Sequence, residues 1–120
     1  MKSKIFVVLA AAVSLWIPSG PVAAHHGVAG YDMTKTITVH GTVSKFDWSN
    51  PHVRLYLEVK DASNTVTWEV DMGPPNQQIM NGWKIDTYRH GDRVSIEIYP
   101  AKDGSNVGYG KKVTALPRSE

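Results

Sequence analysis

Three of the five histidines in this 120-residue chain stand where an imidazole nitrogen could bind a metal ion. His25 and His26 directly follow a segment that is typical of export signals, and cleavage after Ala24 would make His25 the first residue. Its α-amino group and imidazole Nδ1 would then chelate one metal ion. A third nitrogen, for which His52 is the candidate, would complete a T-shaped copper(II) site, because amine and imidazole nitrogens suit copper.

A cut one residue earlier would instead leave the terminal tripeptide Ala24-His25-His26, which also binds copper(II) or nickel(II) with help from its backbone amides. The histidines have plainer interpretations as well. The pair can simply mark an exposed mature end, and His52 can cap a carbonyl in a turn. His40 and His90 are expected on the surface, one on a polar strand face and the other in a Gly-Asp turn.

The side chains around His52 form a second candidate, a ligand-binding face that needs no metal. Trp48 and Asn50 precede it, while Arg54 and Tyr56 share its outward parity on the strand that follows. An exposed Trp beside polar groups could contact a protein or stack on a glycan. The rival hypothesis is therefore an accessory domain that binds a protein or small ligand through these five residues, which we call the His52 face.

The common catalytic arrangements are missing from the sequence. The chain has no cysteine, which excludes disulfides, thiolate chemistry and covalent haem attachment. It has no Gly-x-Ser-x-Gly elbow. Glu58, Glu69 and Glu97 are expected to pair with basic neighbours on a solvated sheet face rather than to hydrolyse glycosides. The sequence therefore predicts a binding module and not an enzyme, with a mononuclear copper oxidative enzyme as a weaker alternative.

Residues 1–24 have the three parts of a secretory signal peptide. Lys2 and Lys4 form the positive start, the 13-residue run Ile5–Ile17 is apolar at all but one position, and Val22-Ala23-Ala24 supplies the small residues that signal peptidase needs. A run of that length is shorter than the ~20 residues that span a bilayer. We expect a periplasmic or secreted protein without a stable membrane anchor after cleavage.

Removal of the signal peptide also balances the charge. The full chain carries 13 basic and 11 acidic residues, and loss of Lys2 and Lys4 leaves 11 of each. Nucleic-acid binding depends on Lys and Arg residues that neutralise phosphates. Because the mature chain has no surplus of them, we expect no nucleic acid among its partners.

After an N-terminal arm at residues 25–35, apolar and polar residues alternate in five segments, as in half-buried strands. Gly41 is expected to mark a bulge or bend in the first strand. The fifth strand, from Tyr109 to Leu116, has the weakest alternation. The expected core consists of the inward residues Ile37, Val39, Val43, Leu55, Leu57, Val66, Trp68, Val70, Val94, Ile96 and Ile98.

A short helix is expected between the third and fourth strands. It would start at Pro75 or Asn76 and end at Gly82, with Trp83 and Ile85 folding onto the core behind it. The order β-β-β-α-β-β over residues 36–116 best fits a small all-β fold, the five-stranded OB-like barrel. A small β-sandwich or an SH3-like barrel is the alternative.

A spaced series of residues resembles a known family. The series includes His25-His26, Trp48-Ser49-Asn50-Pro51-His52, Gly82-Trp83 and Asp103-Gly104-Ser105, of which the Asn-Pro-His and Gly-Trp elements are the most specific. Over essentially the whole mature chain it resembles the short exported bacterial proteins known as domain of unknown function 6152. Members typically carry an aromatic residue two or three positions after the His pair, where this chain has Val28 and Ala29. The resemblance implies no activity.

Overall fold

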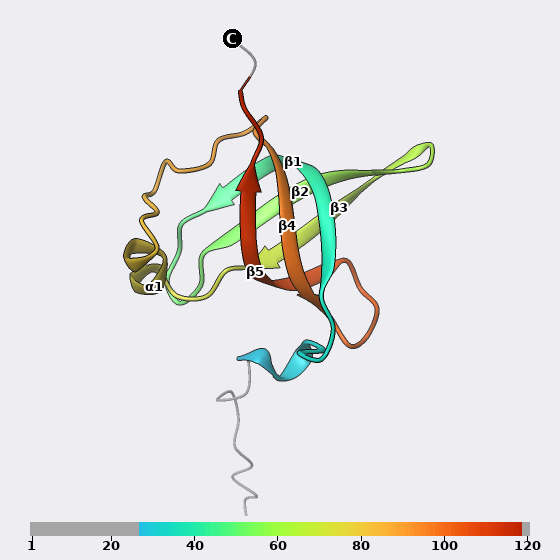
Figure 1. The fold of residues 1–120 in the computed structure, drawn as a ribbon, viewed down its shortest axis with the longest axis horizontal. Helices are drawn as coiled ribbons and strands as arrows, with labels where there is room; N and C mark the ends of the chain where they lie inside the picture. Colours follow the sequence, from blue (N-terminus) through green and yellow to red (C-terminus); the bar gives the residue numbers. More distant parts are fainter. Residues whose placement is uncertain (1–26, 119–120) are drawn as a thin grey trace, which may run out of the picture.

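The computed structural model describes residues 27–118, so the predicted signal peptide and the residues His25 and His26 lie outside the described residues. Five strands form a closed barrel in the order β1-β2-β3-β5-β4 (Figure 1). The elements are η1 (Val28–Gly30, a 3-10 turn), β1 (Ile37–Asp47), β2 (Arg54–Asp61), β3 (Asn64–Asp71), α1 (Pro75–Met80), β4 (Arg93–Pro100) and β5 (Val107–Ala115). The predicted all-β barrel with one short helix after the third strand is confirmed.

Strand β1 is long because it pairs with two neighbouring strands. Its first half pairs antiparallel with β4 and its second half pairs antiparallel with β2, with Thr42 at the crossover. Strands β2 and β3 form an antiparallel hairpin that projects beyond the barrel (Figure 1). The barrel closes through a short parallel pair between Glu69–Asp71 of β3 and Val107–Tyr109 of β5. This pair places the end of β3 beside the start of β5.

The crossover in β1 requires a close approach to β2 at Gly41. A Cβ atom on this residue would lie 2.9 Å from the carbonyl oxygen of Glu58. The bulge predicted at Gly41 lies instead three residues further along, where Ser44 is the extra residue between Val43 and Lys45. Gly41, predicted to mark a bulge or a bend, is therefore not the bulged residue, and its missing side chain serves the close contact between two strands.

The barrel interior is filled by alternating apolar residues of β1 to β4, together with residues from the loops. The buried apolar residues are Val39, Val43, Val53, Leu55, Leu57, Val70, Met72, Tyr88, Val94, Ile96 and Ile98. Val66 and Trp68, expected in the core, are half-buried. Ile37 was also expected there, but it is 36% exposed. At that end of β1 only β4 lies alongside, so one side of Ile37 is left uncovered.

Four aromatic rings form a cluster against the core. Phe46 meets Trp48, Trp83 and Tyr88 edge-on, with ring centroids 5.9, 6.2 and 5.5 Å away. Trp48, predicted to be exposed, is therefore half-buried. The prediction that Ile85 folds onto the core is wrong, since this residue is 70% exposed. Trp83 and Tyr88, whose rings are 4.9 Å apart, already cover this part of the core.

Helix α1 starts at Pro75, as predicted, and ends at Met80, two residues before the predicted end at Gly82. Pro75 occupies its first turn, where a backbone N–H would have no partner within the helix. A Schellman motif ends it: the N–H groups of Gly82, at φ +84°, and Trp83 donate to carbonyls of the last turn. The buried amide of Gln78 donates to the carbonyl of Met72 and so ties α1 to the chain after β3. Within residues 27–118 no helix has the length and apolar character to cross a bilayer.

Candidate functional site

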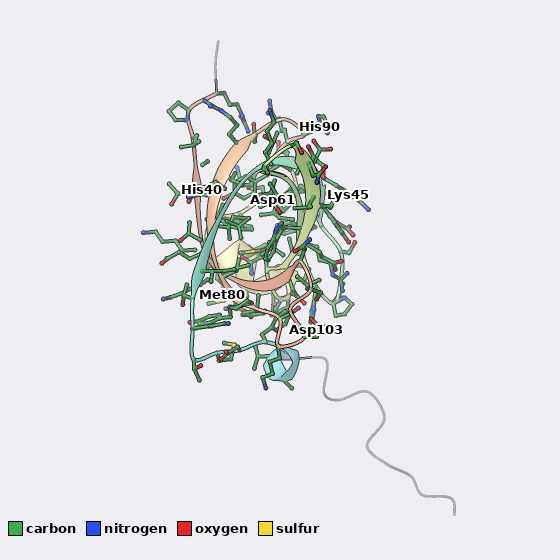
Figure 2. All side chains as sticks on the ribbon, turned by 90° about the vertical axis from the view of Figure 1, so that its right-hand side faces the viewer. His40, Lys45, Asp61, Met80, His90 and Asp103 are labelled. Carbon is green, nitrogen blue, oxygen red and sulfur yellow. The ribbon has the colours of Figure 1, made fainter. Side chains whose placement is uncertain are left out.

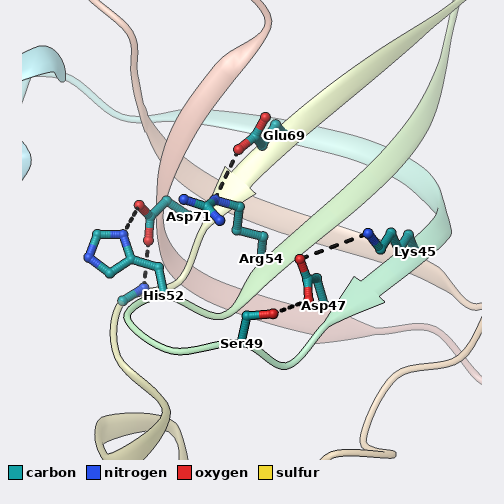
Figure 3. A network of polar contacts seen from close by, with 8 residues as sticks. Lys45, Asp47, Ser49, His52, Arg54, Glu69 and Asp71 are labelled. Carbon is teal, nitrogen blue, oxygen red and sulfur yellow. Dashed lines mark hydrogen bonds and ion pairs between the residues drawn. The ribbon is translucent and has the colours of Figure 1, made fainter. Parts of the chain in front are cut away.

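His52 lies in the loop between β1 and β2, and two backbone hydrogen bonds hold this loop against the end of β3. The N–H of Val53 donates to the carbonyl of Gly73 at 2.8 Å, and the N–H of Met72 donates to the carbonyl of Val53 at 2.9 Å. His52 consequently meets Asp71, the last residue of β3. Its Nδ1 lies 2.6 Å from Asp71 Oδ2 (Figure 3).

Asp71 fixes the orientation of this imidazole. Its other oxygen, Oδ1, accepts a hydrogen bond from the N–H of Gly73 at 2.8 Å. The side chain of Asp71 is 9% exposed and that of His52 is 25% exposed. An ionised carboxylate only accepts hydrogen bonds, so Nδ1 of His52 is the donor. In the neutral ring Nε2 then keeps its lone pair, and Figure 3 shows this nitrogen on the side of the ring away from Asp71.

Sequence reasoning missed Asp71 as a site residue. Its parity on β3 matches Thr67 and Glu69, which predicts a solvent-facing carboxylate, yet the residue is buried. His52 and the turn at Gly73, with φ +83°, lie against it. The one signal in the sequence is an Asp two residues before a Gly, a spacing that suits an Asx turn.

The other predicted members of the His52 face are partly engaged with neighbours. Arg54 Nε lies 3.0 Å from Glu69 Oε1 on the adjacent strand. The Lys45 ammonium lies 5.5 Å from the centre of the Tyr56 ring. Asn50 is exposed in the loop between β1 and β2. The indole of Trp48 packs inward. The accessible part of the His52 face is therefore mainly polar.

The described part of the N-terminal arm packs against the connection between β4 and β5 (Figure 1). Three backbone contacts hold it: Tyr31 forms an isolated bridge with Ala101, the N–H of Asp32 donates to the carbonyl of Pro100 at 2.8 Å, and the N–H of Lys102 donates to the carbonyl of Gly30 at 2.9 Å. These contacts anchor the arm at the end of β4 and the beginning of the connection that follows it.

Tyr31 brings the arm next to Asp71. Its ring centroid lies 5.7 Å from that of Tyr109, and Tyr109 is the partner of Asp71 in the parallel pair. Burial raises the pKa of the Tyr31 hydroxyl, and the nearby negative charges of Asp71 and Glu69 raise it further. The anchored part of the arm therefore lies beside the carboxylates of the site.

No three His, Asp or Glu side chains within residues 27–118 gather closely enough to hold a metal ion. His40 and His90 are exposed and lie on other parts of the barrel surface (Figure 2). The described residues thus offer His52 as a single oriented ligand. The other two predicted ligands, His25 and His26, lie outside the described residues.

A five-stranded barrel with a long first strand shared by two neighbours and a helix after the third defines an OB-fold protein. This chain belongs to the DUF6152 family, a family of unknown function, whose profile matches residues 13–111. The predicted family resemblance is therefore confirmed. No match was found among curated proteins.

Solved structures with the same fold include the mitochondrial single-stranded DNA binding protein Rim1 of S. cerevisiae. One crystal form aligns with a TM-score of 0.54 at 14% identity, covering 71% of this chain and 96% of that chain. A second form aligns with a TM-score of 0.53 at 13% identity, covering 72% and 97%. At this level of identity the likeness shows the fold alone.

Proposed function

We propose that this protein is a periplasmic or secreted binding module that holds one transition-metal ion, with copper(II) preferred, beside the loop between β1 and β2. The ligands are Nε2 of His52 and the amine and imidazole nitrogens of His25 and His26. The observation that carries the proposal is the 2.6 Å contact between His52 Nδ1 and Asp71 Oδ2. In metal sites a carboxylate commonly holds a ligating histidine in this way, which orients the ring and raises the basicity of the other nitrogen.

The ligand set favours copper(II). Nitrogen ligands bind Cu(II) more tightly than the other divalent ions of the first transition row. After cleavage, His25 offers an amine and an imidazole nitrogen in one chelate ring, and His52 adds a third nitrogen from the barrel. The proposed role is to hold the ion and not to catalyse a reaction. Oxidation of a substrate by the bound copper is the weaker alternative.

One observation favours a second candidate, an accessory domain that binds a protein or a glycan without metal. An open pocket of about 550 Å³ lies between the loop that carries His52 and the start of α1, and its lining residues are Asn50, Pro74, Pro75, Asn76 and Ile79. Apolar walls with a few amide groups are typical of sites for uncharged ligands. In this alternative Arg54 and Tyr56 extend the same face.

The similarity to single-stranded DNA binding proteins does not make nucleic acid the proposed ligand. The mature chain has 11 basic and 11 acidic residues, and the surface around His52 carries the carboxylates of Asp47, Glu69 and Asp71 (Figure 3). Lys45 and Arg54 each lie beside one of these carboxylates, so the face offers phosphates no surplus of positive charge. We expect no micromolar binding of a fluorescent single-stranded oligonucleotide at physiological salt, and such binding would overturn this part of the proposal.

Copper(II) titration of the processed, exported protein tests the metal proposal, once N-terminal sequencing has located the cut. We expect one ion per chain, bound far more tightly than in His52→Ala. His40→Ala is the matched control, because His40 is an exposed barrel histidine outside the site. A chain with Met-Gly added before His25 displaces the amine and is expected to bind weakly. Equal affinity in all four proteins would overturn the composite site and favour the metal-free alternative.

A further inference from the structure

A second open pocket lies on the barrel where the β2–β3 hairpin separates from β1. The pairing of β1 with β2 ends at Thr42 and Glu58, whereas the hairpin continues to Asp61 and Asn64 and projects beyond the barrel (Figure 1). The pocket has a volume of about 330 Å³, and β1, β2, β3, β4 and the chain after β5 all contribute to its lining. It shares no residue with the His52 face.

Three charged side chains of this pocket are grouped around Thr42. Thr42 is the partner of Glu58 in β2 and of Arg93 in β4. Lys60 follows Glu58 on the same face of β2, because successive side chains of a strand alternate between its faces. Directly paired residues have their side chains on the same face, about 5 Å apart. Two cationic groups and one carboxylate therefore line one pocket.

None of these three charged groups has an ion-pair partner within residues 27–118. The sequence predicted that Glu58 pairs with a basic neighbour, and in the structure it does not. Since β2 and β4 lie on opposite sides of β1, the backbones of Glu58 and Arg93 are about 10 Å apart. On the His52 face, by contrast, Arg54 lies 3.0 Å from Glu69. The charges of the second pocket therefore remain available to a ligand.

The rest of the lining supplies apolar contact and hydrogen-bonding groups. The N–H of Leu116 donates to the carbonyl of Arg93 at 2.9 Å, which fixes the chain after β5 at the pocket. The Leu116 side chain is 43% exposed. The hydroxyls of Thr42 and Thr65 and the imidazole of His40 can donate or accept hydrogen bonds. A pocket of this volume with an apolar side and a few polar groups suits a small molecule.

We propose that this pocket binds a dicarboxylic amino acid, such as L-glutamate. Such a ligand carries two carboxylates and one ammonium group, which complement the two cations and one carboxylate of the lining. Its carboxylates contact the guanidinium of Arg93 and the ammonium of Lys60, its own ammonium contacts Glu58, and its aliphatic part lies against Leu116. Hydrogen bonds between ionised groups are the strong ones, and a guanidinium can hold a carboxylate with two of them.

Glu58 distinguishes this ligand from a simple anion. Phosphate or a dicarboxylate without an amine would satisfy Arg93 and Lys60 but would place further negative charge beside Glu58, and like charges repel. An amino acid with a neutral side chain would leave one of the two cations without a partner. The lining therefore favours L-glutamate over glutarate, which lacks the ammonium group, and over L-glutamine, which lacks the second carboxylate.

Isothermal titration calorimetry of the processed, exported protein tests this preference. No copper is added, because the nitrogen and oxygen atoms of amino acids bind copper(II) themselves. We expect L-glutamate to bind with a Kd of about 1 mM or lower. Its affinity should be about tenfold or more above those of glutarate and L-glutamine. Absence of L-glutamate binding, or equal binding of the three compounds, would overturn the proposal.

Each charged side chain has its own expected effect. Arg93→Gln and Lys60→Gln each remove a partner of one carboxylate and should lower the L-glutamate affinity about tenfold or more. Glu58→Gln should bind L-glutamate and glutarate with similar affinity, because the group that recognises the ammonium is gone. Lys84→Gln is the matched control, since Lys84 is an exposed lysine outside the pocket, and it should keep the parent affinity. Circular dichroism checks that each variant is folded.

The variants also separate this site from the proposed metal site. His52→Ala should bind L-glutamate as the parent does, whether or not it still binds copper. Parent-like L-glutamate affinity in both Arg93→Gln and Lys60→Gln would overturn the proposal. An equal loss in Lys84→Gln would do the same, because net charge and not the pocket would then determine binding.

Discussion

Among single residues, His52 differs from His40 and His90 in what its ring nitrogen contacts. His40 and His90 are exposed, and neither makes a side-chain hydrogen bond with any other residue in the described range 27–118. His52 has the carboxylate of Asp71 at its Nδ1. A ring that is already oriented loses less conformational freedom when its other nitrogen binds, so preorganisation favours His52 as the ligand.

Substitution Asp71→Asn tests this preorganisation. We expect copper affinity to fall about 10- to 100-fold, the usual effect of losing a carboxylate that supports a metal-bound histidine. The neutral amide no longer raises the basicity of the ring. The measurement is a copper titration in competition with a chelator of known affinity.

Asp47→Asn is the matched control for this change. Asp47 lies on the same face, accepts a hydrogen bond from Ser49 and lies 3.9 Å from the Lys45 ammonium (Figure 3). Its substitution alters the charge of the face equally but leaves His52 untouched, so the affinity should be nearly unchanged. Equal losses in the two variants would mean that general charge, and not the orientation of His52, determines copper binding.

Whether a residue of the site could be predicted depends on how far apart in the sequence it and its contact partners lie. His52 was predicted because Asn-Pro-His is a local signal between two alternating segments. Its partner Asp71 comes 19 positions later, and parity alone assigned it to solvent. Tyr31 meets Tyr109 across most of the chain. Contacts of this range arise only when the barrel closes, and no local pattern in one sequence encodes them.

Among the elements, β5 shows why alternation predicts some strands better than others. The strand begins at Val107, two residues before the predicted start at Tyr109. Two of its inward positions are glycines: a Cβ on Gly108 would clash with the Ile98 side chain, and one on Gly110 would clash with the Met72 sulfur, while Val113 packs against the core. Neighbouring side chains occupy the space that β5 would otherwise fill. Part of the apolar half of its pattern is therefore missing from the sequence.

The crossover in β1 gives a prediction at this scale. Gly41→Ala places a Cβ 2.9 Å from the Glu58 carbonyl oxygen, which belongs to the backbone of β2 and cannot rotate away. We expect the free energy of unfolding to fall by about 1–3 kcal/mol, as for other overpacked positions. Urea unfolding measures it. Gly30→Ala is the control, because a Cβ there has nothing within 4 Å, and equal stability of the two variants would contradict a tight crossover.

At the scale of the whole molecule, both the N-terminal arm and the C-terminal tail are bound to the barrel. Figure 1 shows the N-terminal arm and the C-terminus at opposite ends of it. At the C-terminal end, Arg118 Nε lies 2.7 Å from Asp92 Oδ1 and its Nη2 lies 2.8 Å from Asp92 Oδ2. The carbonyl of Asp92 also accepts a hydrogen bond from the N–H of Val43 in β1 at 2.7 Å. The pair therefore links the C-terminal tail to the junction of β1 and β4.

This ion pair makes stability depend on pH in acid. Hydrogen bonds from the Arg118 side chain, helped by the N–H of Arg89, lower the pKa of Asp92 from 3.8 to about 2. A carboxyl whose pKa is lower in the folded state stabilises the fold in its ionised form. That contribution is complete above about pH 4 and is lost as the pH falls to about 2. We expect Arg118→Ala to have a lower Tm than the parent at neutral pH, with the difference vanishing across that acid range.

Thermal unfolding of the parent, Arg118→Ala and Arg93→Ala along a pH series measures the effect. Arg93 is an exposed arginine next to Asp92 and forms no ion pair among residues 27–118. The Tm of Arg93→Ala should therefore differ from that of the parent by the same amount at every pH. Because the Arg118 side chain is 54% exposed, added salt should also narrow the difference at neutral pH. A difference that persists unchanged from neutral pH down to about pH 2 would mean that Arg118 stabilises the tail by packing rather than through the charge of Asp92.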